Sequence, residues 1–142
     1  MKLKEFRFLK HSADLKYRAY GKTLDECFIN SAKALTHSIA DLDSIGKKTS
    51  TVLEFECFDL DMLLHDFLSE LIYLFETKKM LYSEYQITLD KKKKYYLKVK
   101  AFGEKINPDK HTLKSGIKAV TLHDFFVKKK DGLWISQILC DI

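Results

Sequence analysis

The strongest structural signal in the sequence is a broad apolar stripe between residues 60 and 75. Apolar side chains recur there every three or four positions, which is the spacing of one face of an α-helix. Because the stripe is wide, we expect this helix to lie at the centre of the fold, packed against a sheet. Its start is indicated by Asp59-Leu60-Asp61, whose acids suit the positive end of a helix dipole. The apolar positions are Leu60, Leu63, Leu64, Phe67, Leu68, Leu71, Ile72 and Phe75.

The segments around this helix show the patterns of one more helix and several strands. The capping box Thr23-Leu24-Asp25-Glu26 predicts a helix that runs from Leu24 to about Ala40. Two turns are expected inside hairpins, one at Asp90 to Lys93 and one at Lys130-Asp131-Gly132. Alternation of apolar and polar residues predicts strands at 3–9, 15–21, 52–57, 85–89, 95–101, 119–129 and 133–142.

The order of these elements decides the fold class. Helices do not alternate regularly with strands, so a doubly wound parallel sheet is not expected. We predict an α+β fold, with a mostly antiparallel sheet or sheets of about six to seven strands and two helices packed on one face. The 142 residues include one proline and five glycines, which leaves no room for a flexible linker. Residues 1–142 are therefore expected to form a single domain.

The positive charge of the chain is concentrated in one region. The formal net charge is +5, but residues 78–100 alone carry eight lysines against Glu84 and Asp90, a net of +6. Two interpretations of the run Lys91–Lys94 and the adjacent Tyr95-Tyr96 stay open. The run is either a solvated hairpin tip or a basic patch that binds nucleic acid. The second interpretation would make the chain a small RNA-binding or chaperone-like module.

Several classes of protein are excluded by what the sequence lacks. No run of 18 apolar residues is present, so no membrane-spanning helix is expected, and the N-terminal residues do not resemble a secretory signal. Cys27, Cys57 and Cys140 lie far apart and form no CxxC pair, which excludes a zinc ribbon. We expect them to be small buried hydrophobes in a cytoplasmic protein. Glycine-rich nucleotide loops and the HExxH motif are also missing.

Two acids near the ends of the chain stand out against apolar surroundings. Asp141 follows an apolar segment that should be a paired strand, and an acid buried there would need a partner. Asp14 lies in a polar break between two predicted strands. If the last strand pairs beside the first two, both side chains and the terminal carboxylate of Ile142 converge. Such hard oxygen donors suit Ca²⁺ or Mg²⁺ better than Zn²⁺ or copper.

Segments spread over the whole chain resemble one family, the archeases. The family's H-[TS]-A-D motif corresponds to His11-Ser12-Ala13-Asp14, and its glycine and first helix correspond to Gly21 to Phe28. Its second helix corresponds to Leu63 to Tyr73, its [IV]-K-A-[VI]-T-x-H strand to Ile117 to His123, and its terminal D-I dipeptide to Asp141-Ile142. Ser12 and Leu122 depart from the commonest residues of those motifs.

This resemblance implies a function that composition does not. Archeases are protein cofactors of the RtcB-type RNA ligase of tRNA splicing and RNA repair. They are thought to promote guanylylation of the ligase and to allow multiple turnover. The resemblance therefore implies that the chain is not an enzyme. It also implies that GTP is used by the ligase rather than bound here, and that RNA is met only through that partner.

The resemblance also assigns roles to single residues. The family's metal site matches Asp14, Asp141 and the carboxylate of Ile142 in this sequence. The ion is expected to be divalent, either Ca²⁺, Mg²⁺ or Mn²⁺. The resemblance also implies three secondary functional positions, to which it assigns no specific role: Lys118, His123 and His11.

Overall fold

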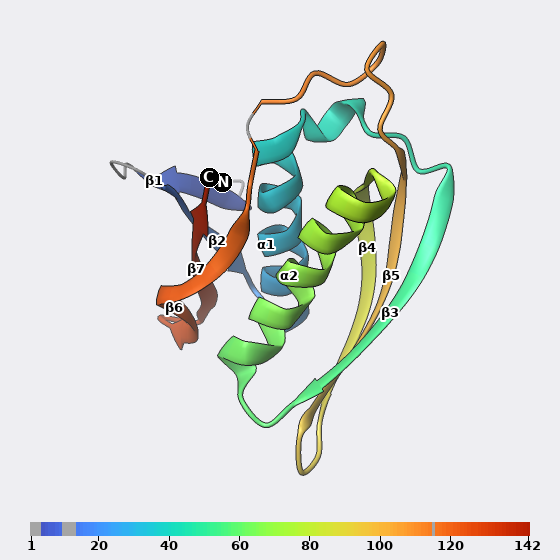
Figure 1. Cartoon of the computed structure of the whole chain (residues 1–142). Coiled ribbons are helices and arrows are strands. Elements are labelled where there is room, and N and C mark those ends of the chain that lie inside the picture. Colours follow the sequence, from blue (N-terminus) through green and yellow to red (C-terminus); the bar gives the residue numbers. More distant parts are fainter. Residues whose placement is uncertain (1–3, 10–13, 115) are drawn as a thin grey trace.

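The chain forms two antiparallel sheets with both helices between them (Figure 1). This computed structural model describes residues 4–9, 14–114 and 116–142. One sheet has four strands in the order β1-β2-β7-β6, and the other has three in the order β3-β5-β4. The strands are β1 (Phe6–Leu9), β2 (Leu15–Gly21), β3 (Thr49–Cys57), β4 (Met80–Lys91), β5 (Tyr95–Lys105), β6 (Ala119–Lys130) and β7 (Leu133–Asp141).

Both helices begin at the capping residues that the sequence predicts. In α1 (Leu24–Ile39), the Thr23 hydroxyl accepts a hydrogen bond from the backbone N–H of Glu26 at 3.1 Å. In α2 (Leu60–Lys78), the Asp59 carboxylate accepts hydrogen bonds from the backbone N–H groups of Asp61 and Met62 in the first turn. A short 3₁₀ turn, η1 (Leu42–Ser44), follows α1. The predicted α+β class and both predicted helices are confirmed.

The apolar stripe of α2 lies in the core, as its width predicts. Six of the eight stripe residues are buried, Leu60 and Phe75 are partly buried, and the helix packs against strands of both sheets. Helix α1 joins the four-stranded sheet through a buried polar bridge. There the Tyr17 hydroxyl donates to the Ser31 carbonyl at 2.9 Å, and the Ser31 and Ser136 hydroxyls are 2.7 Å apart. Because every buried polar atom of this bridge has a partner, its hydrogen bonds offset the cost of desolvation while they fix the position of α1.

Three local predictions differ from the structure. Strand β4 begins at Met80 rather than near residue 85, because a β-bulge between Tyr82 and Glu84 interrupts the alternation that the prediction used. The turn between β4 and β5 lies at residues 92–94. Val52 belongs to β3 but is 54% exposed, because Leu53 and Phe55 occupy the inward face of this strand.

The cysteines and helices agree with the expectations from composition. Cys27 and Cys140 are buried, Cys57 is half-buried, and all three are free thiols. Burial raises the pKa of the Cys27 thiol to about 11 and that of Cys140 to about 12. In the part of the chain that the structure describes, neither α1 nor α2 is long and apolar enough to cross a membrane.

Candidate functional site

The pairing of β2 with β7 brings the two predicted aspartates to facing positions. The antiparallel register matches Leu15 with Cys140, so Asp14 and Asp141 occupy the next positions across from each other. Leu15 and Cys140 are directed toward the core, and side chains alternate along a strand. Asp14 and Asp141 therefore share the outer face at one end of the sheet. Asp14 is half-buried and Asp141 is exposed.

The residue that precedes β6 (Ala119–Lys130) joins the same end of the sheet through its backbone. Ala119 of β6 pairs with Asp141, and the backbone N–H of Lys118 donates to the Asp141 carbonyl at 2.8 Å. Lys118 is exposed, and Ile142 is 47% exposed at the end of β7. Four of the predicted residues thus lie together where β2, β7 and β6 meet. We call Asp14, Lys118, Asp141 and Ile142 the β2–β7 edge site.

The donors of the β2–β7 edge site fit a hard cation, with one condition. Among the described residues, no three His, Cys, Asp or Glu side chains lie together as a metal site. The two aspartates alone therefore provide too few ligands for Ca²⁺ or Mg²⁺, which take six or more oxygens. The carboxylate of Ile142, water or a partner's oxygen would have to complete the sphere. Metal binding by Asp14, Asp141 and Ile142 stays a prediction.

Of the two histidines predicted as secondary positions, the structure describes only His123. His11 lies outside the described residues. His123 lies in the irregular part of β6, where the register with β7 shifts between Thr121 and Phe126. Its exposed ring contacts Asp124, with 3.5 Å between Nε2 and the carboxylate, rather than either aspartate of the β2–β7 edge site. No role for His123 follows from these contacts.

A buried ionic cluster that the sequence did not reveal holds the segment leading to Lys118. The Glu104 carboxylate is 5% exposed and accepts hydrogen bonds from Lys110 Nζ at 2.7 Å, from His111 Nε2 at 3.0 Å and from the backbone N–H of Gly46. His111 Nδ1 in turn accepts from the backbone N–H of Asn107 at 2.9 Å, which orients the ring so that Nε2 faces Glu104. The cluster thereby fastens residues 104–111 to the loop that follows η1.

The partners of Glu104 strongly favour its charged form. The hydrogen bond from Lys110, followed by the N–H of Gly46, lowers the pKa of Glu104 to about 2 from the usual 4.5. Nothing in the sequence singles out this residue, because Gly46 is 58 positions away and the segment after Gly103 has no periodic pattern. Only the tertiary structure brings these groups together.

Comparisons with known proteins match nearly the full chain. Residues 6–142 match the Archease protein family. Proteins called "Protein archease" from Pyrococcus furiosus and Methanosarcina mazei are 37% and 36% identical, with 99% and 98% of this chain and 100% and 97% of theirs covered. The solution structure of protein 1598 of Methanobacterium thermoautotrophicum has a TM-score of 0.88 and 30% identity, covering 99% of this chain and 100% of its own.

A second solved structure shows the same fold at greater distance. It is a Thermotoga maritima protein described as an archease and possible chaperone, with a TM-score of 0.58 and 14% identity. The match covers 94% of each chain. At that identity the likeness concerns the fold alone.

The Glu104 cluster gives a prediction about stability. The Glu104→Gln substitution removes the charge that Lys110 and His111 contact, and we expect the free energy of unfolding near pH 7 to fall by about 1–3 kcal/mol. Because the folded-state pKa is lowered, the stability from Glu104 is fully present above pH 4.5 and is lost as the pH falls toward 2. Urea denaturation of both proteins over this pH range measures the effect.

The matched control is Glu84→Gln, which removes a partly exposed carboxylate paired with Lys47 at 3.1 Å. We expect it to change the free energy of unfolding by less than about 1 kcal/mol. A difference between the Glu104→Gln protein and the original that does not shrink in acid would contradict the assignment.

Proposed function

Because the chain belongs to the archease family, we propose that it is a metal-binding protein cofactor that activates an RtcB-type RNA ligase. In this proposal it promotes guanylylation of the ligase and allows multiple turnover in tRNA splicing or RNA repair. The chain itself catalyses no reaction. GTP is bound by the ligase, the RNA ends are joined in the active site of the ligase, and the complex acts in the cytoplasm.

The observation that carries the proposal is the convergence at the β2–β7 edge site. The register between β2 and β7 brings Asp14 across from Asp141, and Lys118, just before β6, donates its backbone N–H to the Asp141 carbonyl. These residues come from both ends of the sequence, and the predicted metal ligands are among them. A site at an exposed sheet end can be reached by a partner protein, whereas a buried site cannot.

Each residue of the β2–β7 edge site has a proposed task. Asp14, Asp141 and the carboxylate of Ile142 would hold a divalent cation, with Ca²⁺, Mg²⁺ and Mn²⁺ all compatible with oxygen ligands. When bound, such a cation supplies charge neutralisation to a triphosphate in nucleotidyl transfer. Lys118 is exposed at the same end of the sheet and would contact a phosphate.

The first prediction from the proposed function is the stimulation of RNA ligation. In a multiple-turnover assay with an RtcB-type ligase, GTP and Mn²⁺, the chain should stimulate the joining of a 3′-phosphate or 2′,3′-cyclic-phosphate RNA end to a 5′-hydroxyl end. Asp14→Asn and Asp141→Asn should each reduce that stimulation roughly tenfold or more, because each removes a proposed ligand. The ligation product is quantified by gel electrophoresis of labelled RNA.

The control for ligation is Asp131→Asn. Asp131 lies at the opposite end of the same hairpin, in the β6–β7 turn with φ 52°, a conformation that asparagine tolerates well. The Asp131→Asn protein should stimulate ligation as the original chain does. Absence of stimulation by the original chain, or full stimulation by the Asp14→Asn and Asp141→Asn proteins, would contradict the proposal.

The second prediction concerns the carboxylate of Ile142. Adding a Gly-Ser extension after Ile142 moves the terminal carboxylate away from Asp141, so the affinity for Mn²⁺ should fall roughly tenfold or more by calorimetry. Ile142→Val keeps the carboxylate in place and should leave the affinity unchanged. An extended protein that binds Mn²⁺ as tightly as the original would remove Ile142 from the proposed ligand set.

A further inference from the structure

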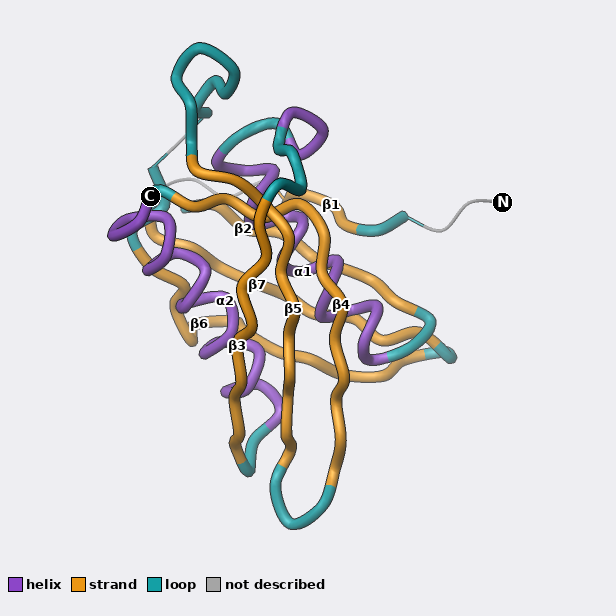
Figure 2. The backbone as a smooth tube through the Cα atoms, turned by 90° about the vertical axis from the view of Figure 1, so that its right-hand side faces the viewer, coloured by secondary structure: helices purple, strands orange, loops and turns teal. Residues whose placement is uncertain are grey.

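We propose that the tip of the β4–β5 hairpin is a contact site for single-stranded RNA. Strand pairing in this hairpin continues to Lys91 and Tyr95, and the backbone N–H of Lys92 donates to the Lys94 carbonyl at 2.9 Å to close the turn. The hairpin extends past the helices and away from the body of the molecule (Figures 1 and 2). We call Lys91–Lys94, together with the neighbouring Phe58, the basic tip.

Two lysines of the basic tip are held by neighbouring side chains. Lys94 Nζ lies 3.5 Å from the Glu56 carboxylate and 5.0 Å from the centre of the Phe58 ring. Lys91 Nζ lies 4.6 Å from the centre of the Tyr95 ring. A cation over an aromatic ring keeps its charge, so Lys91 still contributes positive potential at the tip.

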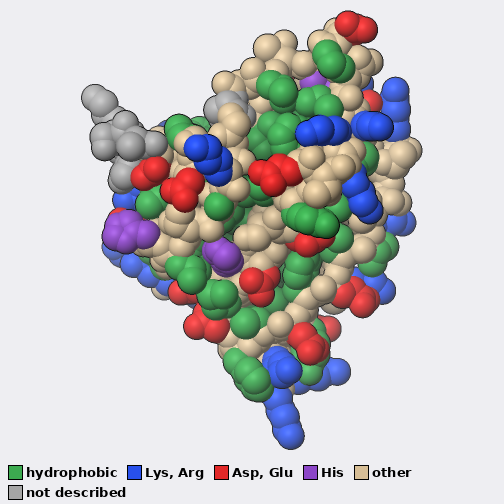
Figure 3. Space-filling model, viewed as in Figure 1, with side chains coloured by type: hydrophobic (Ala, Val, Ile, Leu, Met, Phe, Trp, Pro, Cys, Tyr) green, Lys and Arg blue, Asp and Glu red, His purple; other side chains and the backbone are tan. Residues whose placement is uncertain are grey.

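The other two lysines have no such partners. Lys92 and Lys93 are exposed in the turn, and neither forms an ion pair within 4 Å in the part of the chain that the structure describes. Figure 3 shows Lys and Arg side chains at the narrow lower end of the molecule, beside a hydrophobic side chain. Uncompensated ammonium groups on a projecting turn attract phosphates, and phosphate contacts release condensed counterions.

An exposed aromatic ring makes RNA bases a better fit than phosphate alone. Phe58 is 70% exposed, immediately after β3, and its ring is already beside the ammonium group of Lys94. Every base has a π-face that stacks on such a ring, whereas a base inside a duplex is already stacked on its neighbours. The pairing of free cations with an exposed ring therefore favours a single strand.

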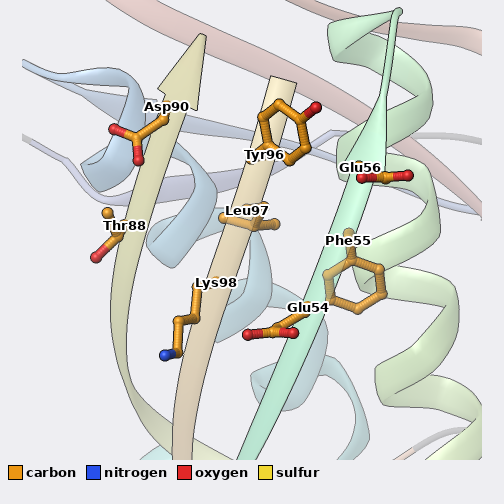
Figure 4. Close-up of a pocket in the computed structure, with 8 residues that line it drawn as sticks. All are labelled: Glu54, Phe55, Glu56, Thr88, Asp90, Tyr96, Leu97 and Lys98. Carbon is orange, nitrogen blue, oxygen red and sulfur yellow. The ribbon is translucent and has the colours of Figure 1, made fainter. Parts of the chain in front are cut away.

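An acidic hollow next to the basic tip limits where the strand can run. The outer face of the three-stranded sheet has a hollow of about 510 Å³, where Glu54, Glu56 and Asp90 lie on both sides of Tyr96 and outnumber the one lysine of its lining, Lys98 (Figure 4). In the described structure neither Glu54 nor Asp90 forms an ion pair within 4 Å. These carboxylates repel phosphates, so a strand would cross the tip rather than follow the sheet. A flat anionic membrane would bring its phosphates close to these carboxylates, so the hollow disfavours a membrane as the partner.

The inference does not depend on the proposed function, and it can be tested without a ligase. Fluorescence anisotropy with a labelled single-stranded RNA of about 10 nucleotides should show binding that weakens as NaCl rises from about 50 to about 200 mM. The combined substitutions Lys92→Gln and Lys93→Gln should raise Kd roughly tenfold. They should also reduce the slope of log K against log salt by about 1.4, since each single-strand phosphate contact contributes about 0.7.

Three further proteins separate this site from general attraction of RNA to a basic chain. Lys129→Gln with Lys130→Gln removes the same charge from the other hairpin and should leave the slope unchanged. Phe58→Leu should weaken binding without changing the slope, because stacking is lost and no charge is altered. Glu54→Gln with Asp90→Asn should strengthen binding, because it removes repulsion. Circular dichroism checks that each protein is folded.

Several results would overturn the inference. One is the absence of RNA binding at about 50 mM salt. Another is an equal effect of the two double-lysine changes, which would show attraction to the whole chain. A third is binding to phosphatidylserine vesicles without binding to RNA. Loss of ligase stimulation in the Asp14→Asn protein with unchanged RNA binding would support two separate sites.

Discussion

The pairing of β2 with β7 is the interaction on which the proposed site depends. It joins the two ends of the sequence in one antiparallel sheet and places Asp14 and Asp141 at facing positions. The pairing is fixed by burial, because Tyr17, Ile138 and Cys140 lie fully inside the core. A shift of one residue would turn these side chains toward solvent and the polar ones inward. The packing of the core thus determines the register, and the register determines the β2–β7 edge site.

The two proposed sites lie at opposite ends of the molecule. The acidic edge site is near the end of β7, whereas the basic tip is at the far end of the β4–β5 hairpin (Figure 1). The net charge of +5 therefore describes neither end by itself. We propose that the β2–β7 edge site binds the metal and the ligase, and that the basic tip binds RNA. The two can be changed independently, because substitutions at one end leave the contacts of the other in place.

Sequence patterns predicted the fold well where local rules decide the outcome. The Thr23 cap, the α2 stripe and the Asp131-Gly132 turn were all correct, because caps, periodicity and positive φ depend on neighbouring residues. The bulge near Tyr82 and the Glu104 cluster were missed, since both depend on contacts between distant segments. The facing aspartates were predicted only on the condition that β7 pairs beside β2, which the structure meets.

The most direct test of the central proposal is the location of the metal. Crystals of the chain grown with Mn²⁺ should show an anomalous scattering peak between Asp14 and Asp141, with the Ile142 carboxylate among its ligands. Oxygen ligands in a Mn²⁺ site are expected at roughly 2.0–2.6 Å, as for other hard cations. A peak at another place in the chain, or an edge site that stays empty while the protein binds Mn²⁺ in solution, would contradict the account.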